Sequence, residues 1–290
     1  MPETVRSVQE TFGGTETLEG AGVRLHRLFG NAHVPKFDPF LLFDNFGSAD
    51  PHDYEAGFPW HPHRGIETVT YMLEGRVEHD DSLGNSGVIG SGDVQWMSAG
   101  SGIIHQEMPK QRDGMLQGFQ LWVNLPARDK MSLPAYRGLV APEIPVVPTP
   151  EGGRVRVIAG DYERVEGPVR GIPVDPTYLD VSLPAGGEFS VPVPRGHTAL
   201  AYAVEGAGAF DASDRSMGAD HVALYGDGDR VTVRAGDAGV RFLVVAGRPL
   251  GEPVAWYGPI VMNRPEELSQ AVVELRRGDF IKHPRPIVEE

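Results

Sequence analysis

The chain has 290 residues, which is long enough for two domains of ordinary size, each with its own hydrophobic core. The formal net charge of −14 opposes direct binding to nucleic acid, and the absence of cysteine excludes disulfides and thiolate chemistry. No apolar run approaches the roughly 18 residues of a membrane span, and the first residues lack the apolar stretch of a signal peptide, so we expect a soluble, cytoplasmic protein.

Most segments of the chain are typical of β-strands, because they are short, rich in β-branched or aromatic residues and bounded by glycine or proline. In chain order, the clearest strand segments are residues 68–73, 118–123, 154–158, 178–183 and 241–245. Near the end, apolar residues at helical spacing follow Asn263, which can cap a helix together with Glu266, and Gly278 can end that helix. The sequence therefore predicts an all-β protein with one short C-terminal helix over residues 264–277.

Three short motifs recur in the same order in the two halves of the chain. The matches are Arg64-Gly65 with Arg195-Gly196, Tyr71-Met-Leu-Glu-Gly75 with Tyr202-Ala-Val-Glu-Gly206, and Gly90-Ser-Gly-Asp93 with Gly226-Asp-Gly-Asp229. The first two matches are 131 positions apart and the third is 136 positions apart, which indicates two copies of one β unit. We predict two tandem β-barrels in residues 1–135 and 154–290, joined by a proline-rich, extended linker in residues 136–153.

Two pairs of metal-ligating residue types lie at strand spacing. His61-Pro-His63 and His105-Gln-Glu107 each place two ligand side chains at positions i and i+2, which point to the same face of a β-strand. Three imidazoles and one carboxylate would leave one or two positions open on a six-coordinate ion, as in a reactive metal centre rather than a structural one. Such ligands suit iron, manganese, nickel, cobalt, copper or zinc, so the residues alone do not select the metal.

The surroundings of these pairs extend the prediction. The offsets of the repeat place Pro192, Pro194, Arg241 and Leu243 at the four ligand positions of the second copy, so we predict a metal-free second barrel. Glu67 is a rival ligand that could share a face with His63, or an outer carboxylate that orients a ligating imidazole. Four residues near the ligands could wall an apolar pocket or fill the core: Phe58, Trp60, Trp96 and Met97. The other histidines, among them His79, lack paired spacing, and we expect them to be solvated or to make ordinary hydrogen bonds.

Several longer stretches resemble the pirin family of the cupin superfamily. They are Pro39–Asp44, Gly57–Gly75, Gly92–Gly100, His105–Pro109 and Gly251–Asn263. The resemblance covers nearly the whole chain and implies two cupin-type (jelly-roll) barrels in tandem. It also implies iron in the N-terminal barrel, held by His61, His63, His105 and Glu107, with Glu107 rather than Glu67 as the carboxylate ligand.

The resemblance leaves two classes of function open. Some pirins resemble quercetin 2,3-dioxygenases, which cleave flavonols such as quercetin with O2. In such an enzyme an Fe(II) ion would lower the pKa of the flavonol 3-hydroxyl, and Glu107 would accept its proton as general base. Other pirins are described as transcriptional cofactors or regulators that act by binding proteins, so an iron-containing regulatory or redox-sensing protein is the alternative. We expect the dioxygenase, with a small aromatic substrate and with neither nucleic acid nor membrane as a direct partner.

Overall fold

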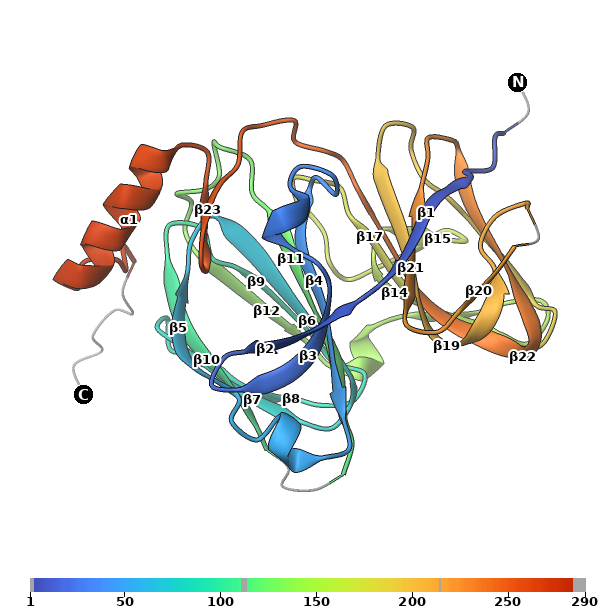
Figure 1. Ribbon diagram of the computed structural model, residues 1–290, viewed down its shortest axis with the longest axis horizontal. Helices are drawn as coiled ribbons and strands as arrows, with labels where there is room; N and C mark the ends of the chain where they lie inside the picture. Colours follow the sequence, from blue (N-terminus) through green and yellow to red (C-terminus); the bar gives the residue numbers. More distant parts are fainter. Residues whose placement is uncertain (1–2, 111–113, 214, 284–290) are drawn as a thin grey trace. The chain divides into compact units, whose positions relative to one another are not determined.

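The protein is represented by a computed structural model that describes residues 3–110, 114–213 and 215–283 (Figure 1). Its regular structure is almost entirely β-strand, and α1 (Pro265–Arg277) is the one α-helix among these residues. The all-β prediction is therefore confirmed. Within the same described ranges, no helix is both long and apolar enough to cross a membrane.

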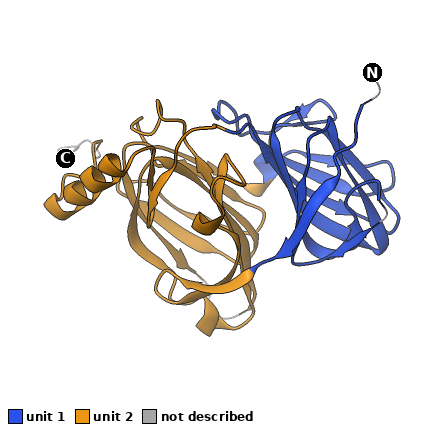
Figure 2. Cartoon of the chain, turned by 45° about the horizontal axis from the view of Figure 1, so that its top comes forward, with its two compact units in different colours: residues 1–14, 142–249 blue, residues 15–141, 250–290 orange. Residues whose placement is uncertain are grey.

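The chain forms two compact units, which Figure 2 shows in separate colours. Unit 1 consists of residues 1–14 and 142–249, and unit 2 consists of residues 15–141 and 250–290. Each unit is described separately below.

Unit 2 contains two antiparallel sheets, a seven-stranded one in the order β12-β9-β6-β11-β4-β3-β2 and a four-stranded one in the order β5-β10-β7-β8. The strands are β2 (Thr15–Glu19), β3 (Val23–Phe29), β4 (Phe40–Ser48), β5 (Phe58–His63), β6 (Ile66–Glu74), β7 (Val77–Asp81), β8 (Ser86–Ile89), β9 (Val94–Ser98), β10 (Ile103–Pro109), β11 (Leu116–Asn124) and β12 (Ala135–Leu139). The 3-10 turns η1 (Asn31–His33) and η2 (Pro51–Asp53), the hairpin of β23 (Ala255–Tyr257) and β24 (Ile260–Met262), and α1 complete it. Side chains from both sheets line one interior cavity, because alternate residues of a strand share a face.

Unit 1 has one nine-stranded antiparallel sheet in the order β1-β21-β19-β22-β17-β14-β13, with β18 added to β22 and β20 to β19. Its strands are β1 (Val8–Gly13), β13 (Val146–Pro148), β14 (Arg154–Ala159), β17 (Thr177–Leu183), β18 (Glu188–Pro192), β19 (Thr198–Ala209), β20 (Ser216–Gly218), β21 (His221–Tyr225) and β22 (Arg230–Gly247), with a short hairpin of β15 (Asp161–Tyr162) and β16 (Val165–Glu166). The 3-10 turn η3 (Ala141–Glu143) lies at the boundary between the units in sequence. Apolar side chains fill the interior, where Phe242 packs edge-on against both Phe189 and Phe210.

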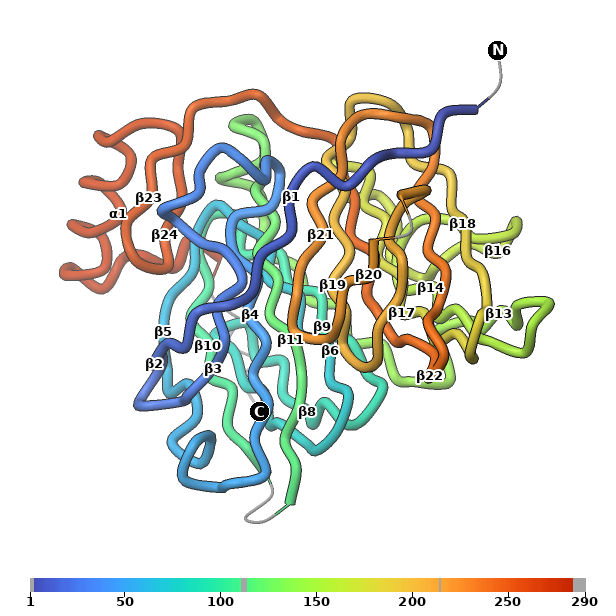
Figure 3. Tube along the Cα trace, turned by 45° about the vertical axis from the view of Figure 1, so that its right-hand side comes forward, coloured from blue at the N-terminus to red at the C-terminus, as the bar shows by residue number. Residues whose placement is uncertain are grey.

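Each unit takes a terminal segment from the other half of the sequence, which the predicted ranges 1–135 and 154–290 do not allow for. In unit 1, β1 pairs with β21, as Figure 3 shows. In unit 2, α1 packs against the barrel because Ala271 and Phe280 share an apolar cluster with Ile104 of β10. β1 joins unit 1 because its backbone pairs at a sheet edge, and α1 joins unit 2 because its apolar face is buried there. Neither interaction requires the partners to be close in sequence.

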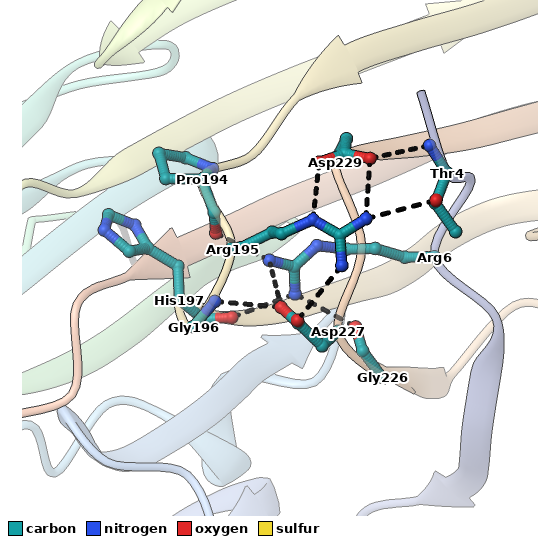
Figure 4. A network of polar contacts seen from close by, with 9 residues as sticks. All are labelled: Thr4, Arg6, Pro194, Arg195, Gly196, His197, Gly226, Asp227 and Asp229. Atoms are coloured by element: carbon teal, nitrogen blue, oxygen red, sulfur yellow. Dashed lines mark hydrogen bonds and ion pairs between the residues drawn. The ribbon is translucent and has the colours of Figure 1, made fainter. Parts of the chain in front are cut away.

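An arginine holds each of these terminal segments in its unit. In unit 2, Arg64 Nη1 forms an ion pair of 2.7 Å with Glu274 of α1. In unit 1, Arg195 Nη2 donates to Thr4 Oγ1 at 3.1 Å, and the same guanidinium pairs with Asp229 at 2.8 and 2.9 Å (Figure 4). Both arginines belong to the first match of the repeat, so this match marks the same structural role in the two units.

The predicted helix is present, but its N-terminus is capped one residue later than predicted. Arg264 is the N-cap, and Glu267 Oε2 accepts hydrogen bonds from the backbone N–H groups of Asn263 and Arg264. The predicted cap of Asn263 with Glu266 is therefore wrong. Gly278 ends the helix in the left-handed conformation with φ of 79°, as predicted.

Residues 136–153 are not the extended linker that their prolines predict. Within this stretch and next to it, β12 pairs with β9 in unit 2, and β13 pairs with β14 in unit 1. Both β12 and β13 are the outermost strands of their sheets. Proline is tolerated in such edge strands because its missing N–H removes no hydrogen bond from the sheet, so composition alone gives the wrong prediction here.

The first two matches of the repeat have the same local conformation in both units. Gly65 and Gly196 have φ of 77° and 78°, and Gly75 and Gly206 have φ of 89° and 73°. These positive values favour glycine because it has no Cβ. The offset of 131 positions is therefore confirmed for this part of the repeat.

The third match, with its offset of 136 positions, is not a structural match. Arg241 and Leu243 lie in the part of β22 that pairs with β17 and β19. This part of β22 corresponds to β11, which pairs with β4 and β6 in unit 2. The part of β22 that pairs with β18 corresponds to β10, which pairs with β5 in unit 2. Arg230 begins this part of β22 and is opposite Pro192, and His105 of β10 is opposite His61. Arg230, and not Arg241, is therefore the counterpart of His105. The alignment at an offset of 136 positions rests on a shared turn motif and is wrong.

Candidate metal centre

Three histidines converge where β5 and β10 pair. His105 is opposite His61 in this antiparallel pair, and His63 is opposite Ile103. The ring centroids lie 4.3 Å apart for His61 and His105, 4.9 Å apart for His61 and His63, and 5.0 Å apart for His63 and His105. One ring nitrogen of each histidine lies within 4.8 Å of the others. The alternation of side chains along the two strands thus brings the three predicted histidines together.

Hydrogen bonds orient the two imidazoles of β5 in the same sense. Nδ1 of His61 lies 2.9 Å from the carbonyl oxygen of Pro59, and Nδ1 of His63 lies 3.2 Å from the carbonyl oxygen of Pro259. A carbonyl oxygen can only accept, so Nδ1 carries the proton in both rings. In a neutral ring with this tautomer, Nε2 keeps its lone pair, as a metal ligand requires.

His105 completes this donor set from β10. Its Nδ1 lies 3.4 Å from Nδ1 of His79, and its Nε2 is buried without a hydrogen-bond partner among the described residues. Burial, and then the neighbouring imidazoles, hold the pKa values of His105 and His63 well below the usual range, so both rings are neutral. A neutral imidazole with an unpartnered, buried nitrogen fits a bound transition-metal ion.

Glu107 lies two residues after His105, but the strand pairing shifts between them. Glu107 is opposite Phe58, so β5 has one extra residue here, a β-bulge, which re-aims the side chains around it. The carboxylate is buried and accepts a hydrogen bond from Thr70 Oγ1 at 2.9 Å. It groups with His105 and His79, so the four predicted ligands fall into two groups, and only His105 belongs to both.

The structure adds His79, which the sequence pattern did not distinguish from solvated histidines. His79 is fully buried, with Nδ1 at 2.7 Å from Gln95 Nε2 and Nε2 at 3.4 Å from Asp81 Oδ2. Its ring stacks on Tyr136 with a centroid distance of 4.9 Å. Of the two roles expected for His79, solvation or ordinary hydrogen bonding, the structure shows hydrogen bonding in a buried position. A signal was present, because His79 and Asp81 have the same i, i+2 spacing as the predicted ligand pairs.

Four other residues predicted near the site belong to neither group of candidate ligands and do not line the interior cavity of unit 2. Trp96 Nε1 donates to Glu67 Oε2 at 3.0 Å, and burial raises the pKa of Glu67 to about 7 against this hydrogen bond. Trp60 is 54% exposed, and Met97 is buried in an apolar core cluster. The structure therefore does not place Glu67 as a rival ligand, and these side chains form parts of the core and surface.

A cavity of about 640 Å³ lies beside the histidines, inside unit 2. Its aromatic lining residues are Phe46, Tyr54, Phe58, Trp122 and Trp256, and its wall also includes His61, His63 and Glu107. Trp122 contacts His63 edge-on, with ring centroids 5.0 Å apart, and Trp256 lies 5.8 Å from Trp122. Of the predicted pocket residues, Phe58 lines this cavity. Trp122 lies 15 positions after Glu107 and Trp256 lies 149 positions after it, and the folded chain brings both into the wall of this cavity.

Comparisons with known proteins agree with this architecture. The chain matches the family described as Pirin over residues 22–123 and the Pirin C-terminal cupin domain over residues 178–281. It is 49% identical to the pirin-like protein of Caulobacter vibrioides, over 95% of this chain and 99% of that protein, and 43% identical to pirin of Homo sapiens, over 90% and 89%. Among solved structures, quercetin 2,3-dioxygenase from Acinetobacter baumannii has a TM-score of 0.88 and 33% identity, over 96% of this chain and 99% of that one. The prediction of two cupin-type barrels is confirmed.

Proposed function

Because this chain belongs to the pirin family, and because three imidazole nitrogens converge beside an aromatic cavity, we propose that it is a metal-dependent dioxygenase that cleaves flavonols such as quercetin with O2. The observation that carries the proposal is the buried, unpartnered Nε2 of His105 among the two oriented histidines of β5. A solved relative with 33% identity is named quercetin 2,3-dioxygenase, which supports this reaction class. A cytoplasmic location is part of the proposal, in keeping with a chain that has no cysteine.

The residues that would hold the metal are His61, His63, His105 and Glu107, and the metal we propose is Fe(II). When bound, a divalent ion supplies Lewis-acid chemistry, which lowers the pKa of a coordinated flavonol 3-hydroxyl. Glu107 would accept that proton as general base when its carboxylate is not bound to the metal, and the position of this carboxylate in the wall of the cavity supports the role.

The cavity supports a planar aromatic substrate. Trp122 and Trp256 form one wall next to His63, and Phe58 lies on β5 beside the bulge. Flat apolar walls exclude water from the reacting ring and hold it at the metal-binding end of the cavity. Cleavage with O2 would release carbon monoxide and a depside, so both oxygen atoms of O2 are consumed in the products.

Metal content and quercetin consumption test the proposal together. Wild-type protein purified without added metal should contain a transition metal, most of it iron, and should consume quercetin under air. His61→Ala should lose the metal and fall to background activity. His221→Ala is the matched control, because His221 makes the same local hydrogen bond, from Nδ1 to the carbonyl two residues earlier at 2.8 Å, but lies in unit 1. No substrate loss above the His61→Ala background would reject the dioxygenase.

A second candidate function is an iron-containing, redox-sensing protein that acts by binding other proteins. Unit 1 motivates it, since unit 1 keeps a β-barrel but has Pro192 and Arg230 where unit 2 has His61 and His105. A pull-down with ferrous and ferric protein would separate the two candidates. The regulatory function requires a partner whose retention depends on oxidation state, and equal retention in both states would remove it.

A further inference from the structure

A row of polar side chains crosses the inner face of the larger sheet of unit 2. The strand pairing places Arg27 of β3 next to Asp44 of β4, Asp44 next to Gln120 of β11, and Gln120 next to Thr70 of β6. All four residues line the cavity that also contains the histidines. Since neighbouring strands lie about 4.8 Å apart, the row is about 14 Å long.

The row is connected to the candidate metal centre at one end. Thr70 Oγ1 lies 2.9 Å from Oε1 of Glu107 and 2.7 Å from Oε1 of Gln120. At the other end, Arg27 forms a two-pronged ion pair with Asp44, at 2.9 Å for Nε and 2.8 Å for Nη2. A molecule with one end at the histidines would therefore lie along the row towards β3.

Apolar residues flank this row on both sides. The adjacent inward positions on one side are Leu42, which pairs with Trp122, and on the other side Phe46, which pairs with Gly118. A barrel interior that only had to be stable would gain more from apolar side chains at these positions, because buried polar groups lose their hydration. A row of polar side chains between apolar surfaces instead provides directional hydrogen bonds, which suits a planar ring that carries polar substituents.

The charges of the row select the kind of substituent. Arg27 Nη1 also contacts Glu19 Oε1 at 2.8 Å, so two carboxylates surround one guanidinium. This excess of negative charge opposes a carboxylate or phosphate on the ligand, while Arg27 opposes a cation. Burial raises the pKa of Asp44 to about 6 against the effect of Arg27, so Asp44 is ionised at neutral pH and accepts hydrogen bonds. A hydroxyl group can donate to Asp44 and accept from Arg27 or the Gln120 amide.

We propose that Arg27, Asp44 and Gln120 form a subsite for the ring hydroxyl groups of a polyhydroxylated, planar aromatic substrate whose reacting end lies at the three histidines. This subsite rests on the proposed dioxygenase function and deepens it. It selects, among flavonols that share the same metal-binding end, those that carry hydroxyl groups on the rings farther from the metal.

Binding of two flavonols, measured without turnover, tests the subsite. The protein is loaded with zinc under nitrogen, and quenching of tryptophan fluorescence is titrated with quercetin and with 3-hydroxyflavone, which has the same 3-hydroxy-4-keto end but no other hydroxyl. Wild type should bind quercetin at least roughly tenfold more tightly than 3-hydroxyflavone. Arg27→Met combined with Asp44→Leu should remove this preference and leave the affinity for 3-hydroxyflavone unchanged. Replacing both ions together avoids an unpaired buried charge.

Two further variants keep the result interpretable. Gln120→Leu alone should reduce the preference even if the double variant unfolds. The control is Arg241→Met combined with Asp180→Leu, which removes a pair of the same geometry, 3.1 and 2.8 Å, from unit 1 and should change neither affinity. If wild type binds both flavonols equally, or if the Gln120 and double variants keep the full preference, the subsite is rejected and the dioxygenase stands. If neither flavonol binds wild type, the subsite falls together with the proposed function.

Discussion

Glu274 is the acidic partner of a buried arginine, and its removal tests how the C-terminal helix stabilises unit 2. Oε2 of Glu274 forms an ion pair with Arg64 Nη1 at 2.7 Å, without the alignment of a hydrogen bond, and Oε1 accepts from Gln270 at 2.9 Å and lies 3.0 Å from Lys282 Nζ. Arg64 is only 2% exposed. Removing one partner of a buried pair costs about 3–5 kcal/mol, so Glu274→Ala should lower the free energy of unfolding of unit 2 by about that amount.

The same contacts predict a part of the stability that is lost in acid. Burial alone would raise the pKa of Glu274, but the hydrogen bond from Gln270 and the positive charges of Lys282 and Arg64 outweigh burial and lower the pKa to about 2. The folded-state pKa then lies below the unfolded value of about 4.3, so folding favours the ionised form. This stabilisation is complete above about pH 4.3 and is lost as the pH falls towards 2. At about 1.4 kcal/mol per pH unit it is on the order of 3 kcal/mol, and Glu274→Ala should abolish it.

Tryptophan fluorescence measures this effect in unit 2 separately, because all four tryptophans, at positions 60, 96, 122 and 256, belong to that unit. Urea unfolding of wild type and of Glu274→Ala should be compared at pH 7 and near pH 3. The control is Glu266→Ala in the first turn of the same helix, an exposed residue whose loss should cost less than about 1 kcal/mol. Equal unfolding free energies for the two variants at pH 7 would refute the reasoning, as would an unchanged acid dependence in Glu274→Ala.

Two further predictions concern the candidate site and its supporting turn. His79→Leu should weaken metal binding by roughly 10–100-fold, because the ring of His79 contacts Nδ1 of His105 and orients this ligand. Competition with a chelator measures the metal affinity, and an unchanged affinity would show that His79 only fills space. Gly65→Ala should lower the free energy of unfolding, measured in urea, by about 4 kcal/mol, because the new Cβ would lie 2.0 Å from the carbonyl oxygen of Val261. Gly196→Ala, with nearly the same φ but open space around the Cβ, should cost only about 1–2 kcal/mol, and a similar loss for both would contradict the clash.

The strand-rich fold and the histidine cluster follow from local patterns in the sequence. Position along a strand fixes the face to which a side chain points, so His61-Pro-His63 and His105 could be expected to converge once both segments were assigned as neighbouring strands. The β-bulge opposite Glu107 has no such signal, because one extra residue in β5 changes the pairing without changing the spacing in β10. The grouping of Glu107 with His79 could therefore not be predicted from spacing alone.

Motif similarity and strand register give different alignments of the two units, and register is the better guide. The Gly-x-Gly-Asp turns match in sequence because tight turns of any register need the same residues, so this match says little about which strands follow. The polar row of the cavity shows the reverse case. Arg27, Asp44, Thr70 and Gln120 share no motif and are spread over nearly a hundred positions, yet the pairing of four strands aligns them.

The C-terminal segment is part of the candidate metal centre and not an addition to it. The carbonyl of Pro259 fixes the tautomer of His63, and Arg64, the residue that follows β5, is held by Glu274 and by the carbonyl of Phe280. A fragment that ended at residue 135 would contain every predicted ligand but neither of these supports. The ligand pairs in the sequence therefore identify the donor atoms, whereas the orientation of those atoms depends on residues about two hundred positions away that only the folded chain brings beside them.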